Sequence, residues 1–234
     1  MAKNILKITK LTKKLWKNKV LDWVDMNIEI WSIYWLLWPN GAWKTTILKV
    51  ISWIIKKDNW DIIFNKNKFT LESLNDIGVL IDHPILYENN SWIDNLKIHA
   101  LLSNKNYKKF DEILDLVWLK KEARKNKVKT YSLWMKQRLA IAIALVWEPK
   151  LLILDEPLNW IDIEWVIEFR DILKNLQSKW ITIIISSHIL NEIQKTCSHI
   201  WIFNKWKMKF EWTMEELLKL WNDVEQSYLN FIKQ

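Results

Sequence analysis

The chain has 234 residues, half of them hydrophobic, with a net charge of +8 and one cysteine. This length allows one sizeable domain or two small ones, and a single cysteine excludes an internal disulfide framework. No apolar run reaches membrane-spanning length, and Lys3, Lys7 and Lys10 interrupt any signal peptide. We therefore expect a cytoplasmic protein in a reducing setting, with its scattered lysines on a solvated surface.

The first part of the chain reads mostly as strands. Apolar residues that alternate with polar ones favour half-buried strands, and short apolar runs favour buried strands. These patterns predict strands over residues 3–11, 20–30, 33–37, 61–64 and 66–69, and a helix over 44–55. A further strand, from 77, ends in the carboxylate of Asp82. The first two strands suggest a small antiparallel sheet ahead of the apolar strand at 33–37.

The second part alternates between helices and buried strands. The patterns predict helices over 93–121, 136–146 and 162–177, buried strands over 151–154 and 181–185, and a closing hairpin over 199–203 and 207–210. Thr213 and Glu216 form a capping box that opens a last helix. The fold class is therefore α/β, with a mostly parallel sheet, an N-terminal antiparallel part and an all-helical lobe over about 85–147.

Two residue counts are unusual, because the chain contains 19 tryptophans and only 2 glycines. Glycine usually makes up about 7% of a protein. Turn-like positions such as 60, 180 and 206 hold tryptophan, which adopts positive φ poorly. We hypothesise that most of these tryptophans are glycines in the cell, as happens when a gene that reads UGA as glycine is translated with a UGA-as-tryptophan code. The alternative is a truly tryptophan-rich protein.

Residues 38–46 connect the strand at 33–37 to the next helix. Strand, loop, Lys-Thr and helix is the arrangement of a phosphate-binding P-loop, G-x-x-x-x-G-K-[ST]. Lys44 would contact the β- and γ-phosphates of a nucleotide, Thr45 would bind Mg²⁺, and Thr46 would contact the α-phosphate. Both motif glycines are tryptophans, so the loop is blocked as printed. The expected nucleotide site comprises Trp38, Pro39, Asn40, Gly41, Ala42, Trp43, Lys44, Thr45 and Thr46.

Asp155 and Glu156 follow an apolar strand at the edge where ligands of such sheets bind. Asp155 suits a water-mediated role at Mg²⁺, and Glu156 could polarise an attacking water. The alternative is a helix-capping carboxylate pair. His188, after another buried strand, has the place of a γ-phosphate sensor, although a lone histidine there is usually structural.

A second anion site is possible just before the helix predicted over 136–146. A serine and a glycine at a helix N-terminus can bind an anion, and residue 134 would be that glycine. The alternative is an ordinary N-cap. The candidate residues are Ser132, Leu133, Trp134 and Met135.

Together these segments resemble the ATP-binding cassette (ABC) transporter ATPases over nearly the whole chain. In order, they match the Walker A loop at 38–46, the Q-loop at Asp82, the signature at 132–135, Walker B at 155–156, the D-loop at 159–162 and the switch histidine at 188. Many tryptophans, including those at 31, 35, 38, 43, 60, 134, 160 and 206, stand where this family usually has glycine.

The resemblance implies a single ABC domain over residues 1–234, with residues 1–84 and 148–234 as the nucleotide-binding core and β-subdomain and about 85–147 as the helical subdomain. It implies ATP and Mg²⁺ as cofactors, with Thr45, Asp155 and Asp82 near the metal. Glu156 would be the general base, and His188 would stabilise the γ-phosphate. Asp82 departs from the family, which usually has Gln there.

The resemblance also implies two partners, a second ATPase subunit (identical or different) and a transmembrane permease, with the chain peripheral on the inner face of the cell membrane. The acidic Asp82 and the Ser-Leu-x-Met-Lys-Gln-Arg signature are similar to the bacitracin and lantibiotic export and immunity type. We therefore expect ATP-driven export of a peptide or small toxic compound.

Two alternatives remain. One is a non-transport ABC ATPase acting on nucleic acid or ribosomes, although such proteins usually carry two cassettes or a long coiled-coil insert, so no nucleic acid partner is expected. The other is a catalytically dead binding module, if the tryptophans are real.

Overall fold

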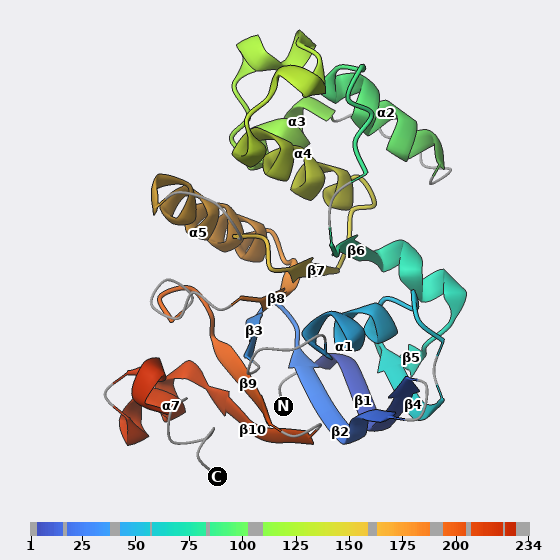
Figure 1. Cartoon of the computed structure of the whole chain (residues 1–234), viewed down its shortest axis with the longest axis vertical. Helices are drawn as coiled ribbons and strands as arrows, with labels where there is room; N and C mark the ends of the chain where they lie inside the picture. Colours follow the sequence, from blue (N-terminus) through green and yellow to red (C-terminus); the bar gives the residue numbers. More distant parts are fainter. Residues whose placement is uncertain are drawn as a thin grey trace.

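A helical lobe stands above a larger body built on two sheets (Figure 1). The computed structural model describes residues 4–15, 18–37, 43–56, 58–82, 85–102, 110–158, 163–187, 194–204, 207–221 and 223–227. Within these residues no helix combines the length and the apolar character needed to cross a membrane.

The smaller sheet is antiparallel and has the order β2-β1-β4-β5. Its strands are β1 (Asn4–Leu15), β2 (Asn18–Glu29), β4 (Asn59–Phe64) and β5 (Asn67–Lys68). The antiparallel sheet predicted at the N-terminus is thereby confirmed. A turn at Trp60 was expected from composition, and this is wrong, because residue 60 lies inside β4. The pairing of β4 with β1 across Thr9↔Asp61 and Thr12↔Asn59 holds the segment extended.

The larger sheet has the order β10-β9-β3-β8-β7-β6. Its strands are β3 (Ile33–Leu37), β6 (Ile77–Leu80), β7 (Leu151–Asp155), β8 (Thr182–Ser186), β9 (His199–Asn204) and β10 (Lys207–Thr213). All pairings except β9 with β10 are parallel. Every residue of β3, β7 and β8 is buried, as expected for strands covered on both faces. The α/β fold class is confirmed.

The helices are α1 (Trp43–Ile51), α2 (Trp92–Leu102), α3 (Phe110–Leu116), α4 (Leu133–Leu145), α5 (Ile163–Ser178) and α7 (Met214–Leu220), with short 3₁₀ turns at η1 (Leu71–Asp76), η2 (Lys121–Lys125) and η3 (Val128–Thr130). The capping box that opens α7 is confirmed, since Glu216 N donates to Thr213 Oγ1 at 3.1 Å. Two predicted helices were too long. The helix predicted to reach residue 55 ends at Ile51, and the one predicted to reach residue 121 ends at Leu116.

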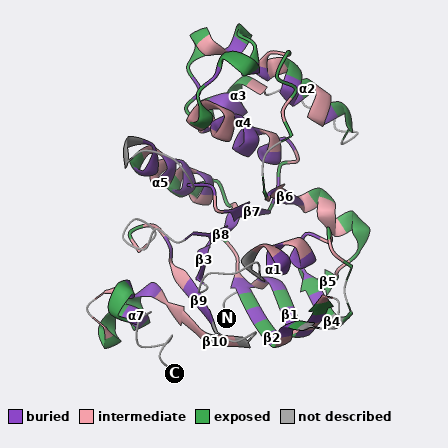
Figure 2. Ribbon diagram, in the orientation of Figure 1, coloured by how far each residue is buried: buried purple, intermediate pink, exposed green. Residues whose placement is uncertain are grey.

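Two clusters of buried side chains hold the molecule together. The strands β3, β7 and β8 are coloured as buried in Figure 2. One cluster joins the helical lobe and α5 to the larger sheet, and the other fills the space between the two sheets and α1. Gly78 of β6 shows how closely lobe and sheet approach. A Cβ at that position would lie 2.4 Å from the carbonyl oxygen of Ala144 in α4, so any side chain would force the two elements apart.

The backbone has an unusual set of left-handed residues. Eleven non-glycine residues in the described part have positive φ, and five of them are tryptophans, namely Trp23, Trp31, Trp53, Trp118 and Trp180. A left-handed conformation costs a non-glycine residue about 1–2 kcal/mol. The five tryptophans together therefore cost about 5–10 kcal/mol, which is comparable to the whole stability of a typical domain, about 5–15 kcal/mol.

Candidate active site

The side chain of Asp155 lies at the edge of the larger sheet where its parallel strands end, and it connects β7, β8 and α1. Asp155 ends β7 and pairs across the sheet with Ser186, the last residue of β8. Its Oδ1 accepts a hydrogen bond from Ser186 Oγ at 2.5 Å, and its Oδ2 accepts one from Thr45 Oγ1 at 2.6 Å. Asp155 is only 7% exposed. The first turn of α1 is thus tied directly to the strand edge where ligands of parallel sheets bind.

Glu156 is the next residue and has a strained backbone. Its φ is 45°, in the left-handed region, and its backbone N donates to both Ser186 Oγ (2.9 Å) and Ser186 O (3.1 Å). Residues in sparsely populated conformations persist only where the surroundings hold them, and they cluster at functional sites. Asp155 uses both carboxylate oxygens on Thr45 and Ser186, which favours the nucleotide-site interpretation over helix capping.

The Thr45–Asp155 pair fits the chemistry of Mg²⁺. A hydroxyl and a carboxylate are hard oxygen donors, and protein sites usually hold Mg²⁺ with one or two such groups together with water and substrate phosphates. Among the described residues, no group of three His, Cys, Asp or Glu side chains could hold a metal by itself. Two oxygen donors would leave most of the coordination positions of a Mg²⁺ ion to water and phosphate oxygens.

Asp82 contacts α1 through Lys49, a different residue of that helix from the Thr45 that contacts Asp155. Its Oδ2 forms an ion pair with Lys49 Nζ of α1 at 2.5 Å, and its φ is 60°. The predicted strand ends at Leu80, so Asp82 lies in the bend that follows β6. The structure thus places Asp82 against α1 through Lys49, and its role at the metal stays a prediction.

Several predicted residues lie outside the described part. Trp38, Pro39, Asn40, Gly41 and Ala42 are not described, and neither is His188. For Trp43 and Lys44 the structure gives only the backbone, which begins α1. Thr46 is described and is 5% exposed.

The serine of the second candidate site caps α4. Ser132 Oγ accepts from the backbone N of Met135 at 3.4 Å, so Ser132 is an N-cap, as the alternative interpretation has it, and its part in an anion site stays a prediction. Leu133 is 55% exposed, and Trp134 is half-buried. These residues lie in the helical lobe, whereas Thr45 and Asp155 lie in the sheet body (Figure 1).

Comparison with known proteins decides the family. A model of the ABC transporter family matches residues 21–159. The chain belongs to the ABC transporter ATP-binding family. The lantibiotic transport ATP-binding protein SrtF of Streptococcus pyogenes is 39% identical over 207 residues, which cover 88% of this chain and 90% of that protein. The bacitracin transport ATP-binding protein BcrA of Bacillus licheniformis is 38% identical over 232 residues, covering 97% of this chain and 74% of that protein.

Solved ABC structures share the fold. CbiO1 from Clostridium perfringens, part of the ABC transporter complex CbiONQ, superposes with a TM-score of 0.82 at 24% identity and covers 92% of this chain and 91% of that one. A dimeric ATP-binding cassette bound to ADP and phosphate superposes with a TM-score of 0.77 at 20% identity, covering 89% and 98%. As an ABC ATP-binding protein, the chain is an ATPase that powers a transporter.

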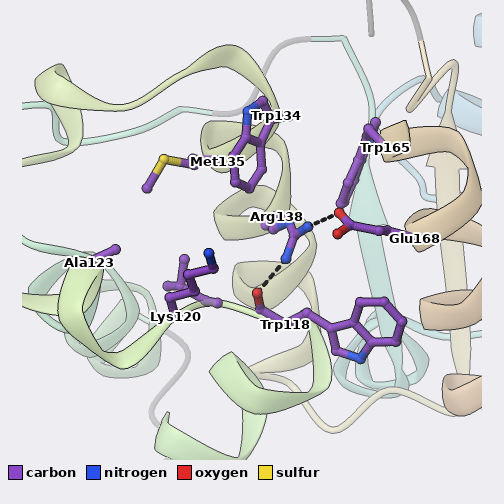
Figure 3. Close-up of a pocket in the computed structure, with 9 residues that line it drawn as sticks. Trp118, Lys120, Ala123, Trp134, Met135, Arg138, Trp165 and Glu168 are labelled. Atoms are coloured by element: carbon purple, nitrogen blue, oxygen red, sulfur yellow. Dashed lines mark hydrogen bonds and ion pairs between the residues drawn. The ribbon is translucent and has the colours of Figure 1, made fainter. Parts of the chain in front are cut away.

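Sequence reasoning quoted Arg138 as part of the signature but did not predict the contacts that its side chain makes (Figure 3). Arg138 of α4 is 4% exposed and lies between the rings of Trp134 and Trp165, at 4.7 Å and 4.8 Å from their centroids. It donates to the carbonyl oxygen of Trp118 and pairs with Glu168 of α5. Burial lowers the pKa of the Arg138 guanidinium, and the carboxylate of Glu168 opposes that shift.

Arg138 thereby ties the helix of the signature segment to α5, beside a cavity of about 650 Å³ that three indole rings help to line. The available sequence signal was a charged residue directly before the apolar run of α4 at 139–146.

Proposed function

We propose that this chain hydrolyses ATP for an ABC exporter that removes a peptide or a small toxic compound through a separate membrane permease. The observation that carries the ATP site is the contact of Thr45 with Asp155, because it joins the helix after the phosphate loop to the carboxylate after β7. Similarity to proteins named for lantibiotic and bacitracin transport supports the class of substrate.

In the proposed site, ATP lies on residues 38–46, with Lys44 at the β- and γ-phosphates. Thr45, together with Asp155 acting through water, would hold Mg²⁺, and the bound ion would supply charge neutralisation at the phosphate oxygens. Glu156 accepts a proton from water as the water oxygen bonds to the γ-phosphorus and the bond to the β–γ bridging oxygen breaks, releasing ADP and phosphate. His188 stabilises the charge on the γ-phosphate.

A second ATPase subunit, identical or different, would complete the site. Ser132 and Leu133 are exposed on the helical lobe rather than folded against Thr45, so they are accessible to a partner's nucleotide. In this proposal residues 1–84 and 148–234 form the core of one ABC domain, and residues at about 85–147 present the signature. Asp82 connects the two parts near the metal.

An apolar groove supports contact with the permease. A cavity of about 430 Å³ lies between β6, α4, α2 and the end of α1. Ile85 and Ile54, which line it, are 79% and 60% exposed. Exposed apolar surface around a groove is typical of a protein interaction site. We propose that a permease segment fills it and holds the chain on the inner face of the membrane.

Replacing Ile85 with aspartate is expected to lower recovery of this chain with the permease subunit of its transporter by at least about 10-fold, because a charge would be buried in the interface. The measurement is co-purification in detergent. The control is Leu220→Asp on α7, where an equally apolar side chain is 63% exposed away from the groove. Equal loss with both variants would contradict docking at the groove.

The function is tested by an ATPase assay on two forms of the chain, one as printed and one with glycine at all 19 tryptophan positions. We expect Mg²⁺-dependent hydrolysis by the glycine form and none by the printed form, since the P-loop motif has glycine at positions 38 and 43, and indoles there would take the space that phosphates need. Hydrolysis by the printed form would overturn the interpretation of the loop as blocked, and a folded glycine form without hydrolysis would contradict the proposed function.

A further inference from the structure

We infer that the protein made in its own cell carries glycine, not tryptophan, at positions 23, 31, 53, 118 and 180, and that one codon assignment restores glycine to the phosphate loop and the signature as well. The identity of the five residues follows from their backbone geometry. The consequence for the ATP site rests on the proposed function.

Two helices end in the same hydrogen-bonding pattern with tryptophan at its centre. After α3, Leu119 N donates to Leu114 O at 2.8 Å and Trp118 N donates to Asp115 O at 3.0 Å, with φ 56° at Trp118. This is the Schellman motif, and its left-handed residue is usually glycine. After α5, Ile181 N reaches Leu176 O at 3.3 Å and Trp180 N reaches Gln177 O at 2.9 Å, with φ 69° at Trp180.

The end of α1 is similar. Trp53 has φ 59°, its N donates to Val50 O at 3.1 Å, and Ile55 N donates to Lys49 O at 3.0 Å. Three described helices therefore end on a left-handed tryptophan. At such a position glycine has no Cβ to clash with the carbonyl group, whereas tryptophan does.

The other two left-handed tryptophans occupy a bulge and a turn. Trp23, with φ 54°, lies where the β1–β2 pairing shifts between Leu11↔Val24 and Lys13↔Leu21. Some β-bulges require glycine at their left-handed residue. Trp31, with φ 61°, lies in the turn before β3, and its backbone is held at both ends by Thr182 Oγ1 and Gln177 Nε2 at 2.8 Å.

Burial does not explain four of the five conformations, whereas Trp53 is half-buried beside Phe69. Trp23 and Trp180 are 64% exposed, Trp31 is 46% exposed and Trp118 is 42% exposed. Side chains so exposed gain little from packing that could hold a strained backbone in place. If left-handed residues were distributed at random, about one of the eleven would be a tryptophan, whereas five are. Tryptophan is therefore over-represented among the left-handed residues, although it adopts this conformation poorly, and glycine is the residue that adopts it without strain.

A single codon assignment extends the inference to residues that the backbone alone does not decide. Trp38, Trp43 and Trp134 would become glycine together with the five. Trp92 fits the same change, because its indole N–H is fully buried and has no acceptor within the described chain. Gly78 would come from an ordinary glycine codon, at a place where no Cβ fits.

Peptide mass spectrometry of the protein isolated from its own host tests the inference directly. Peptides that span residues 118 and 180 are expected to contain glycine at those positions, and so is the peptide that spans residue 43. Tryptophan at 118 and 180 would overturn the inference. Because this readout does not depend on ATP, glycine in a protein that does not hydrolyse ATP would overturn the proposed function and leave the inference standing.

A second measurement, made on the chain with its printed tryptophans, tests whether the left-handed backbone at these positions favours glycine over a residue that has a Cβ. Trp180→Gly is expected to unfold about 2–4 °C above Trp180→Ala, because both remove the indole but only glycine relieves the left-handed backbone. The matched pair is Trp221→Gly and Trp221→Ala, where φ is −136° and glycine should give no advantage. The same difference at both positions would overturn the premise.

Discussion

Replacing Glu156 with glutamine is expected to lower the rate of ATP hydrolysis by about 10³-fold while ATP still binds. A general base typically contributes 10²–10⁴-fold, and glutamine keeps the size of the side chain but cannot accept the proton. The substitution is made in the chain with glycine at the tryptophan positions. Phosphate release gives the rate, and retention of labelled ATP shows that binding survives.

Glu148→Gln is the matched control for this variant. Glu148 also has a left-handed backbone, with φ 49°, and it follows α4, away from Asp155. The control separates loss of the carboxylate from any general effect of glutamine in a strained conformation. A fully active Glu156→Gln variant would remove Glu156 from the chemistry, and equal losses in both variants would point to a folding effect.

Asp155→Asn is expected to raise the Mg²⁺ concentration needed for half-maximal hydrolysis by about 10–100-fold. Groups that orient a metal and its waters typically contribute that much to metal affinity. Asparagine still offers one oxygen to Thr45 or Ser186, but it lacks the negative charge that attracts the cation. Mg²⁺ titration of the hydrolysis rate gives the midpoint.

Ser186→Ala is the control, because it removes the hydrogen bond to Asp155 Oδ1 and leaves the charge in place. Its Mg²⁺ midpoint should move by less than that of Asp155→Asn. An unchanged midpoint for Asp155→Asn would place the metal away from β7 and contradict the proposed role of the Thr45–Asp155 pair.

Sequence patterns predicted helices and strands well where the conformation of a segment depends on residues next to it in the sequence. The buried strands β3, β7 and β8 and the capping box of α7 are where periodicity and composition placed them. Helix ends were less accurate. The apolar period of α1 continues through Ile54, although the helix ends before the left-handed residue 53, because periodicity reports which face is apolar and not where the backbone reverses.

The sequence by itself determined that a strand, a Lys-Thr loop and a helix follow one another at 33–51, since these features are contiguous, and its composition identified the tryptophans as out of place. Only the tertiary structure decided that Thr45 meets Asp155 across 110 residues of chain and that Asp155 meets Ser186 across 31. It also placed Arg138 against Glu168, and it showed which tryptophans have a left-handed backbone. Local patterns reflect the propensities of neighbours, whereas strand order and contacts between distant segments depend on how the whole core packs.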